Sequence, residues 1–178
     1  MIKIKPIIPD STDAEKASMI NREAFPPLEY ISLEELFSIS EKGDGEVLGF
    51  YHEEELTGFA WTIRNARSAY IFFLAIDARY RGQGYGTQSV NALFRYYSEK
   101  QVVLDFEIPD PAAENYEQRI RRKAFYLRCG FHETGRFTML RGERFEVVCN
   151  GGPLDTDSFS EIVKLIHERM PIFHDVLL

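Results

Sequence analysis

The stretch AYIFFLAIDARYRGQGYGTQ, residues 69–88, decides the fold expected of this 178-residue chain. Its first eight residues are all apolar, which predicts a strand buried on both faces and therefore central in its sheet. Gly82, Gly84 and Gly86 follow at alternate positions. Behind them, apolar residues at helical spacing predict a helix that packs on the sheet through Val90, Leu93, Phe94 and Tyr97. The chain thus places a glycine-rich loop between a central strand and a helix.

This glycine-rich loop has the composition of an anion-binding site. The first N–H groups of a helix have no partner inside the helix, and the helix dipole makes this end partly positive. Glycines remove the β-carbons that would keep a phosphate away, and they allow positive φ angles that aim several N–H groups at one point. Arg81 can add a charged contact at the rim. The inferred ligand is a phosphate or pyrophosphate, and a tight turn that binds nothing is the alternative.

Two known phosphate loops do not fit this stretch. A P-loop ends in Gly-Lys-Ser/Thr, whereas Gly86 is followed by Thr87 and Gln88. The dinucleotide fingerprint requires a further glycine at position 87, and it normally opens a βαβ unit.

The elements around this stretch predict one α/β domain over residues 1–178. Strands are expected over 2–8, 46–51, 56–64, 102–108, 131–140 and 144–149. One helix begins with a Thr12–Glu15 capping box, and a second begins at Ser32 with Glu35 as its partner. A third flanking helix carries Tyr116, Ile120 and Leu127 on one face, and Gly130 is its closing residue. A last helix is expected over about 157–169. Hairpins together with helical crossovers predict a mixed sheet.

Composition and charge narrow the setting and the partners. Lys and Arg number 21 against 28 Asp and Glu, a net charge of −7, so nucleic acid is not expected as the main partner. The acidic balance favours a cationic small molecule or simply keeps the protein soluble. No apolar stretch approaches the ~20 residues that span a membrane, and no signal peptide is present, so we expect a cytoplasmic protein without a membrane partner. Cys129 and Cys149 have neither a metal-ligand spacing nor a disulfide pattern, and no metal is expected.

Two motifs in this order resemble the GNAT superfamily of N-acetyltransferases. The first is Arg-x-x-Gly-x-Gly at Arg81, Gly84 and Gly86, behind an apolar strand that ends in LAID. The second, about forty residues later, is AFYLRCGFHETGR, residues 124–136, where a helix carries Tyr126 and ends at Gly-Phe. The element order also matches that family along nearly the whole chain. The resemblance implies an α/β fold with a mixed, mostly antiparallel central sheet, a splayed strand pair and flanking helices.

The resemblance also implies acetyl-CoA, or another acyl-CoA, bound between the two splayed strands. Backbone groups of Leu74, Ala75 and Ile76 would hold the pantetheine arm and the thioester. Main-chain amides would hold the pyrophosphate, and the residues concerned are Arg81, Gly82, Gln83, Gly84, Tyr85, Gly86 and Thr87. Tyr126 matches the tyrosine that lies near the thioester sulfur.

One position departs from the pattern. Many members carry an asparagine seven residues before the tyrosine, and here that position is Arg119, with Asn115 further upstream. The role of Asn115 is therefore open. Arg119 or Arg122 bonds to CoA, braces Glu107, or lies on a solvated helix face.

Acyl transfer to an amine needs a base and a stabilised leaving thiolate. Near pH 7 the neutral fraction of an amine with pKa ~10.4 is below about one in a thousand. Removing its proton therefore costs about 4–5 kcal/mol unless a base or desolvation assists. Glu107 at the carboxyl end of its strand is the candidate base, directly or through water, while Asp105 is expected to be structural. A phenol of pKa ~10 is a weaker acid than a thiol of ~8.5, so Tyr126 would stabilise the thiolate chiefly by a hydrogen bond. The alternative for Glu107 is an ordinary exposed residue at a strand end, and the alternative for Tyr126 is a tyrosine that only packs in the core.

The predicted function is transfer of an acetyl group from acetyl-CoA to a primary amine of a small molecule or peptide, by direct attack. A non-catalytic acyl-CoA sensor or interaction module is the alternative, and O-acyl transfer or a longer acyl chain stays open. By the resemblance, residues 25–36 would wall the acceptor cleft, with Glu29 and Glu34 attracting a cation. Many relatives dimerise, so a homodimer is also considered. The tail, residues 171–178, covers the core or adds a strand to another chain.

Overall fold

A computed structural model describes residues 1–27, 29–140 and 142–170. Leu28 of the expected acceptor wall, Arg141 of the last expected turn and the tail 171–178 lie outside the described residues. The strands are β1 (Ile2–Pro6), β2 (Gly45–His52), β3 (Glu55–Arg64), β4 (Ser68–Ile76), β5 (Gln101–Glu107), β6 (His132–Leu140) and β7 (Glu143–Cys149). The α-helices are α1 (Thr12–Ala24), α2 (Leu33–Ser40), α3 (Tyr85–Tyr96), α4 (Tyr116–Arg128) and α5 (Thr156–Arg169).

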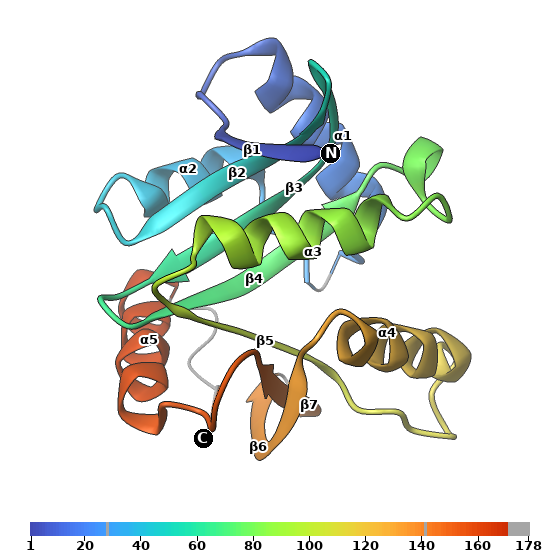
Figure 1. The fold of residues 1–178 in the computed structure, drawn as a ribbon, viewed down its shortest axis with the longest axis vertical. Coiled ribbons are helices and arrows are strands. Elements are labelled where there is room, and N and C mark those ends of the chain that lie inside the picture. Colours follow the sequence, from blue (N-terminus) through green and yellow to red (C-terminus); the bar gives the residue numbers. More distant parts are fainter. Residues whose placement is uncertain (28, 141, 171–178) are drawn as a thin grey trace. The chain divides into compact units, whose positions relative to one another are not determined.

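The strands form a seven-stranded sheet in the order β1-β2-β3-β4-β5-β7-β6 (Figure 1). The pairs β1–β2, β2–β3, β5–β7 and β6–β7 are antiparallel. These features confirm the expected α/β class with a mostly antiparallel sheet flanked by helices. The splay of two central strands stays a prediction.

By its contacts the chain divides into two compact units. The first comprises residues 1–64 and 71–98, and the second comprises residues 65–70 and those from 99 onward. Strand β4 contributes its first three residues to the second unit and its other six to the first. A single domain over residues 1–178 stays a prediction.

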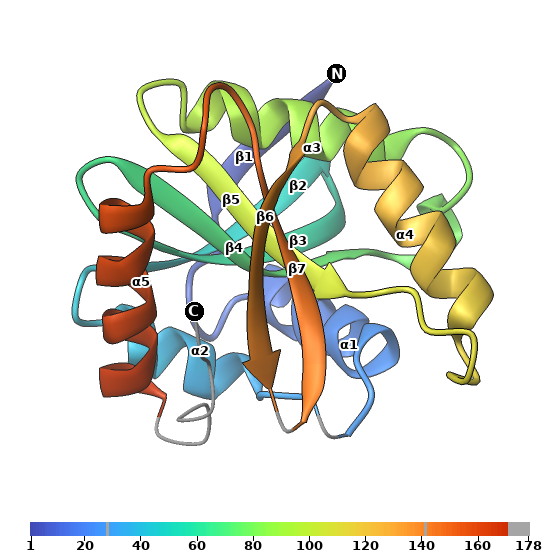
Figure 2. The same cartoon turned by 90° about the horizontal axis from the view of Figure 1, so that it is seen from below.

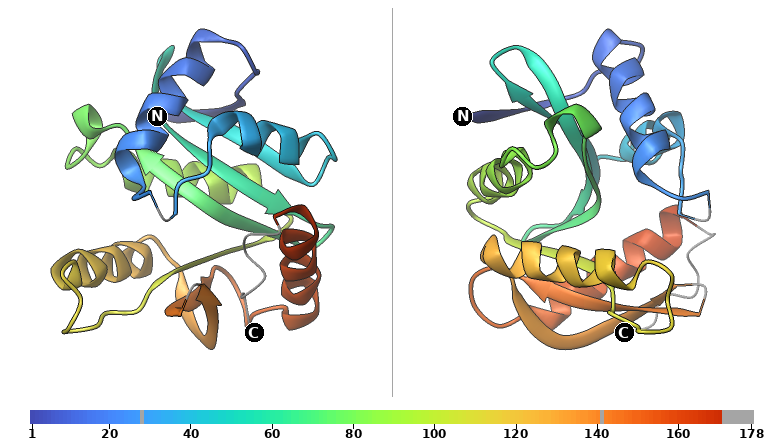
Figure 3. Two further views of the ribbon diagram at one scale, coloured as in Figure 1. Left: turned by 180° about the vertical axis from the view of Figure 1, so that it is seen from behind. Right: turned by 90° about the vertical axis from the view of Figure 1, so that its right-hand side faces the viewer.

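In the first unit, helices cover both faces of the strands. Figure 3 shows α1 and α2 on one face and α3 on the other, and α2 contacts β2 while α3 contacts β1. The Ser32 hydroxyl caps α2 by accepting a hydrogen bond from the Glu35 N–H at 3.2 Å, as expected. The expected Thr12–Glu15 capping box is wrong, because Ser11 is the N-cap of α1 and accepts from the Ala14 N–H at 3.1 Å. A serine one residue upstream satisfies the same orphan donors, so the helix starts where it was expected.

In the second unit, α4 and α5 lie on opposite sides of strands β5 to β7 (Figure 2). Helix α5 buries the apolar face expected from its spacing, formed by Phe159, Ile162, Val163 and Ile166. Helix α4 departs from its apolar pattern, because Ile120 and Leu127 are each 37% exposed. The buried residue of α4 is Arg119 instead.

The two cysteines are both buried and unbridged. Cys129 is the C-cap of α4 and Cys149 ends β7. Desolvation raises the pKa of the Cys149 thiol to about 11. Within the described ranges, no helix combines the length and apolar composition of a membrane span, and no three His, Cys, Asp or Glu side chains are grouped so as to hold a metal ion.

Candidate active site

The glycine-rich loop enters α3 through left-handed backbone. Gly82 has φ 73°, and Gly84, the N-cap of α3, has φ 82°. A side chain at either position would be strained, since L residues rarely adopt these angles. A β-carbon there would nevertheless meet no atom of the described protein within 4 Å. The space above both glycines is therefore open to a ligand.

The amides of this loop are not used by the protein itself. Among the described residues, the backbone N–H groups of residues 82–86 donate no hydrogen bond to backbone or side chain. They stand at the start of the 12-residue helix α3, where the dipole adds partial positive charge. This combination has the geometry of a phosphate-binding helix start.

Along the end of β4, the backbone N–H and C=O groups of successive residues point alternately to the two edges of the strand. The Asp77 N–H donates to the Thr57 carbonyl on β3 at 3.0 Å, which directs the backbone groups of Ala75 toward β3 as well. A β-carbon on Gly58 of β3 would come within 2.4 Å of the Ala75 carbonyl oxygen, so the two strands are very close there. The backbone groups of Leu74 and Ile76 are thereby directed to the other edge of β4. Of the three predicted pantetheine contacts, these two have suitably directed backbone groups.

Arg81 is tied to the strand end rather than extended from the loop. Its Nε donates to the Ile76 carbonyl at 2.8 Å, and the Gln83 side-chain amide donates to the Arg79 carbonyl at 2.8 Å. Arg79 pairs with Asp77 at 2.7 Å, and this hydrogen bond is the main reason that the pKa of Asp77 is lowered. The loop is thus held in shape by its own side chains while its amides stay available.

In the second unit, Tyr126 belongs to the motif that ends helix α4, in the sequence YLRCGF. Gly130 has φ 101°, and its N–H donates to the Leu127 carbonyl at 3.1 Å while the Phe131 N–H donates to the Tyr126 carbonyl at 3.3 Å. This pair of bonds is a Schellman motif, which normally includes an apolar contact between the same two residues. The Tyr126 and Phe131 rings make that contact edge to face, with centroids 5.8 Å apart.

The Tyr126 side chain has an apolar setting and an unused hydroxyl. Its ring stacks on Phe106 of β5 with centroids 5.7 Å apart and an interplanar angle of 11°. The hydroxyl makes no hydrogen bond to the described part of the chain. Desolvation raises the Tyr126 pKa to about 12. A rigid, neutral phenol with a free O–H is suited to donating a hydrogen bond.

Glu107, the predicted base, lies in a buried ion-pair network. One carboxylate oxygen is 3.1 Å from Arg119 Nη2 and the other is 2.8 Å from Arg122 Nη1. Arg119 also donates to the Asn115 side-chain oxygen at 2.8 Å and contacts Glu143 at 3.3 Å. The structure therefore confirms the alternative in which Arg119 and Arg122 brace Glu107, and it gives Asn115 a role in holding Arg119. Both oxygens of Glu107 are thus paired with a guanidinium group.

Replacing Arg119 by alanine is expected to lower the free energy of unfolding by about 3 kcal/mol, because it breaks a buried pair whose side chains are 8% and 9% exposed. Arg121→Ala on the exposed side of the same helix is the control, with an expected loss below about 0.5 kcal/mol. Urea unfolding measures both. A loss below about 1 kcal/mol for Arg119→Ala would show that the brace contributes little.

A second polar cluster of this unit was not anticipated. Asp105 on β5 accepts hydrogen bonds from Thr138 of β6 at 2.5 Å and from Tyr70 of β4. The only hint in the sequence was an acidic residue inside the apolar run VVLDF, residues 102–106. Asp105 had been expected to be structural.

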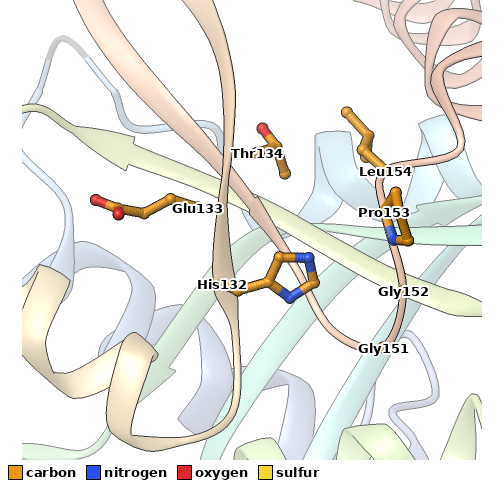
Figure 4. A pocket seen from close by; sticks show the side chains of 7 residues that line it. All are labelled: His132, Glu133, Thr134, Gly151, Gly152, Pro153 and Leu154. Carbon is orange, nitrogen blue, oxygen red and sulfur yellow. The ribbon is translucent and has the colours of Figure 1, made fainter.

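The second unit also has an open pocket of about 430 Å³. Figure 4 shows its lining, which comes from the start of β6 and from the segment between β7 and α5. The residues are His132, Glu133, Thr134, Gly151, Gly152, Pro153 and Leu154. None of them was predicted to bind a ligand.

Comparison with known proteins adds to these observations. A family model described as the acetyltransferase (GNAT) family matches residues 13–131, more than half of the chain. No curated protein gives a significant match.

Solved structures share the fold at low sequence identity. A protein from Bacteroides thetaiotaomicron assigned to the GNAT family has a TM-score of 0.76 at 21% identity, over 93% of this chain and 96% of its own. An aminoglycoside 6'-N-acetyltransferase complexed with coenzyme A has a TM-score of 0.64 at 17% identity, over 83% of this chain and 96% of its own. The ribosomal-protein-S18-alanine N-acetyltransferase from Escherichia coli has a TM-score of 0.59 at 20% identity, over 86% of this chain and 96% of its own. The glycine-rich loop, the element order and the match of the family model together place this chain in the GNAT family of acetyltransferases.

Proposed function

We propose that the protein transfers an acetyl group from acetyl-CoA to a primary amine by direct attack of the amine on the thioester. The observation that carries the proposal is the set of unused amides of residues 82–86 at the start of α3, beneath open space. A pyrophosphate carries negative charge and acceptor oxygens that match these donors. A fold relative complexed with coenzyme A supports the same ligand.

The predicted contacts divide into two groups. The amides of residues 82–86 would bind the pyrophosphate, whereas the predicted Arg81 amide already donates to the Ala78 carbonyl at 3.3 Å. The Thr87 contact stays a prediction. The backbone of Leu74 and Ile76 would bind the pantetheine arm. When bound, acetyl-CoA supplies the activated acyl group. The Tyr126 hydroxyl, which has no partner in the described chain, would donate a hydrogen bond to the departing thiolate.

Removal of the amine proton has two predicted routes. Glu107 as the base stays a prediction, and its two ion pairs weigh against it, because each carboxylate oxygen is already paired with a guanidinium group. Water is the second predicted route. Glu107 acts in this proposal as the anchor of the α4 start, through Arg119 and Arg122.

The acceptor is proposed to be a cationic amine. Among the fold relatives, one is named for aminoglycosides and one for an alanine of a ribosomal protein, so the acceptors of similar folds include small molecules and proteins. The net charge of −7 favours attraction of a cation. A cytoplasmic location, a homodimer and the lack of a nucleic-acid or membrane partner stay predictions.

Two measurements test the proposal. Calorimetry with CoA and acetyl-CoA reports binding, and release of free thiol from acetyl-CoA reports turnover with polyamines, aminoglycosides, amino acids and N-terminal peptides. Binding together with turnover of at least one amine supports an N-acetyltransferase. Binding without turnover across the panel supports the acyl-CoA sensor. Failure to bind either nucleotide would overturn both.

A further inference from the structure

The pocket lined by residues 132–134 and 151–154 lies wholly within the second unit, and the proposed acyl transfer does not use it. Its volume of about 430 Å³ falls within the range of small-molecule sites, about 300–1,000 Å³. A β-carbon on Gly151 or Gly152 would meet no described atom within 4 Å. The glycine side of the pocket is therefore open to a ligand.

This glycine-rich wall, residues 150–155, is held in place from the start of β5. The side-chain nitrogen of Gln101 lies within hydrogen-bonding distance of three carbonyl oxygens, those of Asn150 at 3.3 Å, Gly152 at 3.2 Å and Pro153 at 3.0 Å. The side-chain oxygen of Gln101 accepts from the Asp155 N–H at 2.9 Å. The wall is thus fixed in shape before any ligand binds.

The carbonyl groups of this wall are used, but several of its N–H groups are not. In a trans peptide, the C=O of one residue and the N–H of the next point in opposite directions. Two of the carbonyls that face Gln101 belong to the residues before Gly151 and Leu154, so the N–H groups of these two residues point away from Gln101. Gln101 does not line the pocket. In the described chain, the N–H groups of Gly151, Gly152 and Leu154 donate no hydrogen bond.

A histidine on the other wall adds a further donor. His132 begins β6, and Figure 4 shows its ring directed toward the glycine-rich wall. Its Nε2 lies 3.5 Å from the Cys149 sulfur. Because burial raises the pKa of the Cys149 thiol to about 11, the sulfur keeps its proton and can donate it to Nε2. With Nε2 as the acceptor, the ring proton lies on Nδ1, which has no partner among the described residues.

The lining of the pocket carries little positive charge. No Lys or Arg side chain is among its lining residues in the described ranges. Glu133 pairs with Lys123 of α4 at 2.5 Å, and Figure 4 shows its side chain directed away from His132. The start of α5 is already capped, because the Asp155 carboxylate accepts from the Ser158 N–H at 3.0 Å. Phosphate sites commonly use Arg, Lys or an uncapped helix start, so these donors fit a singly charged group better.

We propose that this pocket binds a small organic carboxylate. The carboxylate oxygens accept from the N–H groups of Gly151 and Leu154 and from the Nδ1–H of His132. The hydrocarbon chain lies against Pro153 and the Leu154 side chain, which line the same wall. All of these groups belong to the second unit, so the site is tested separately from the proposed acyl transfer.

Titration of the ¹⁵N-labelled protein with butyrate tests this site. We expect the amide resonances of Gly151, Gly152 and Leu154 to shift together, with a dissociation constant on the order of 1 mM for so small a ligand. Butyramide has the same shape without the charge, and inorganic phosphate has more charge without the hydrocarbon chain. Each should bind at least about 10-fold more weakly than butyrate.

Two variants locate the ligand, and a third is the control. Gly152→Leu should abolish butyrate binding by filling the pocket, and the fold should tolerate it because Gly152 has no positive φ and its β-carbon meets no described atom within 4 Å. His132→Asn should weaken binding about 10-fold by removing one donor to a charged group. Lys164→Gln removes an exposed cation of α5 outside the pocket and should leave the dissociation constant unchanged.

Three results would overturn the proposal. The first is that butyrate at about 50 mM shifts none of the three amide resonances. The second is that butyramide or phosphate binds as tightly as butyrate, which would contradict the carboxylate as the recognised group. The third is that butyrate binding is unchanged in both Gly152→Leu and His132→Asn, which would place the ligand elsewhere.

Discussion

Gly84→Ala is expected to weaken CoA binding about 30-fold, equivalent to about 2 kcal/mol, while the protein stays folded. The new methyl group would enter the open space above the N-cap of α3, where we place the pyrophosphate. It would also disfavour the left-handed conformation, φ 82°, that aims the loop amides outward. Calorimetric titration with CoA measures the loss.

Gly43→Ala is the matched control for this variant. Gly43 lies between α2 and β2 with φ 87°, and a β-carbon there also meets nothing within 4 Å. Both variants should therefore lose a similar stability, about 1 kcal/mol, by thermal unfolding. CoA affinity should fall only in Gly84→Ala. Equal affinity in the two variants would mean that the pyrophosphate binds elsewhere.

Tyr126→Phe is expected to reduce the rate of acyl transfer about 10- to 100-fold with little change in CoA affinity. A hydrogen bond to a charged group contributes about 1.5–3 kcal/mol, and this bond would form fully only as the thiolate develops. Phenylalanine keeps the stack on Phe106 and the contact with Phe131, so the fold should be unaffected. Single-turnover measurement of thiol release isolates the chemical step.

The pH dependence of this variant follows from the Tyr126 pKa of about 12. Full proton transfer from such a phenol to a thiolate of pKa ~8.5 is uphill by about 5 kcal/mol, so we expect a hydrogen bond rather than proton donation. The phenol stays protonated below pH 10, and the variant should lower the whole pH profile without changing its shape. Tyr116→Phe at the start of α4 is the control. An unchanged single-turnover rate in Tyr126→Phe would show that Tyr126 does not stabilise the thiolate sulfur.

Short sequence patterns correctly predicted strand β4, the glycine-rich loop and the end of helix α4. The apolar run at 69–76 is β4, Ser68–Ile76, and the glycines before α3 adopt the left-handed angles expected of them. Gly130 closes α4 as expected. Such features depend on a few neighbouring residues, so the sequence pattern suffices to predict them.

The charged parts of the site were harder to predict because they depend on long-range pairing. Arg119 stands on a helix whose apolar positions suggested a different buried face, and its partner Glu143 is 24 residues away. The Thr138–Asp105 bond spans 33 residues and requires the β6–β7 hairpin to bring Thr138 over β5. A strand pattern shows that Asp105 lies within a strand, but not which donors surround it.

The burial of both cysteines has a practical consequence for enzymology. Aromatic disulfide reagents react with thiolates, and the native protein shields Cys129 and holds Cys149 as a neutral thiol. Such a reagent should therefore count CoA released from the thioester with a low background from the enzyme. The same reagent, used without substrate, should register two further thiols per chain only as the protein unfolds, so one colour reaction can follow both turnover and denaturation.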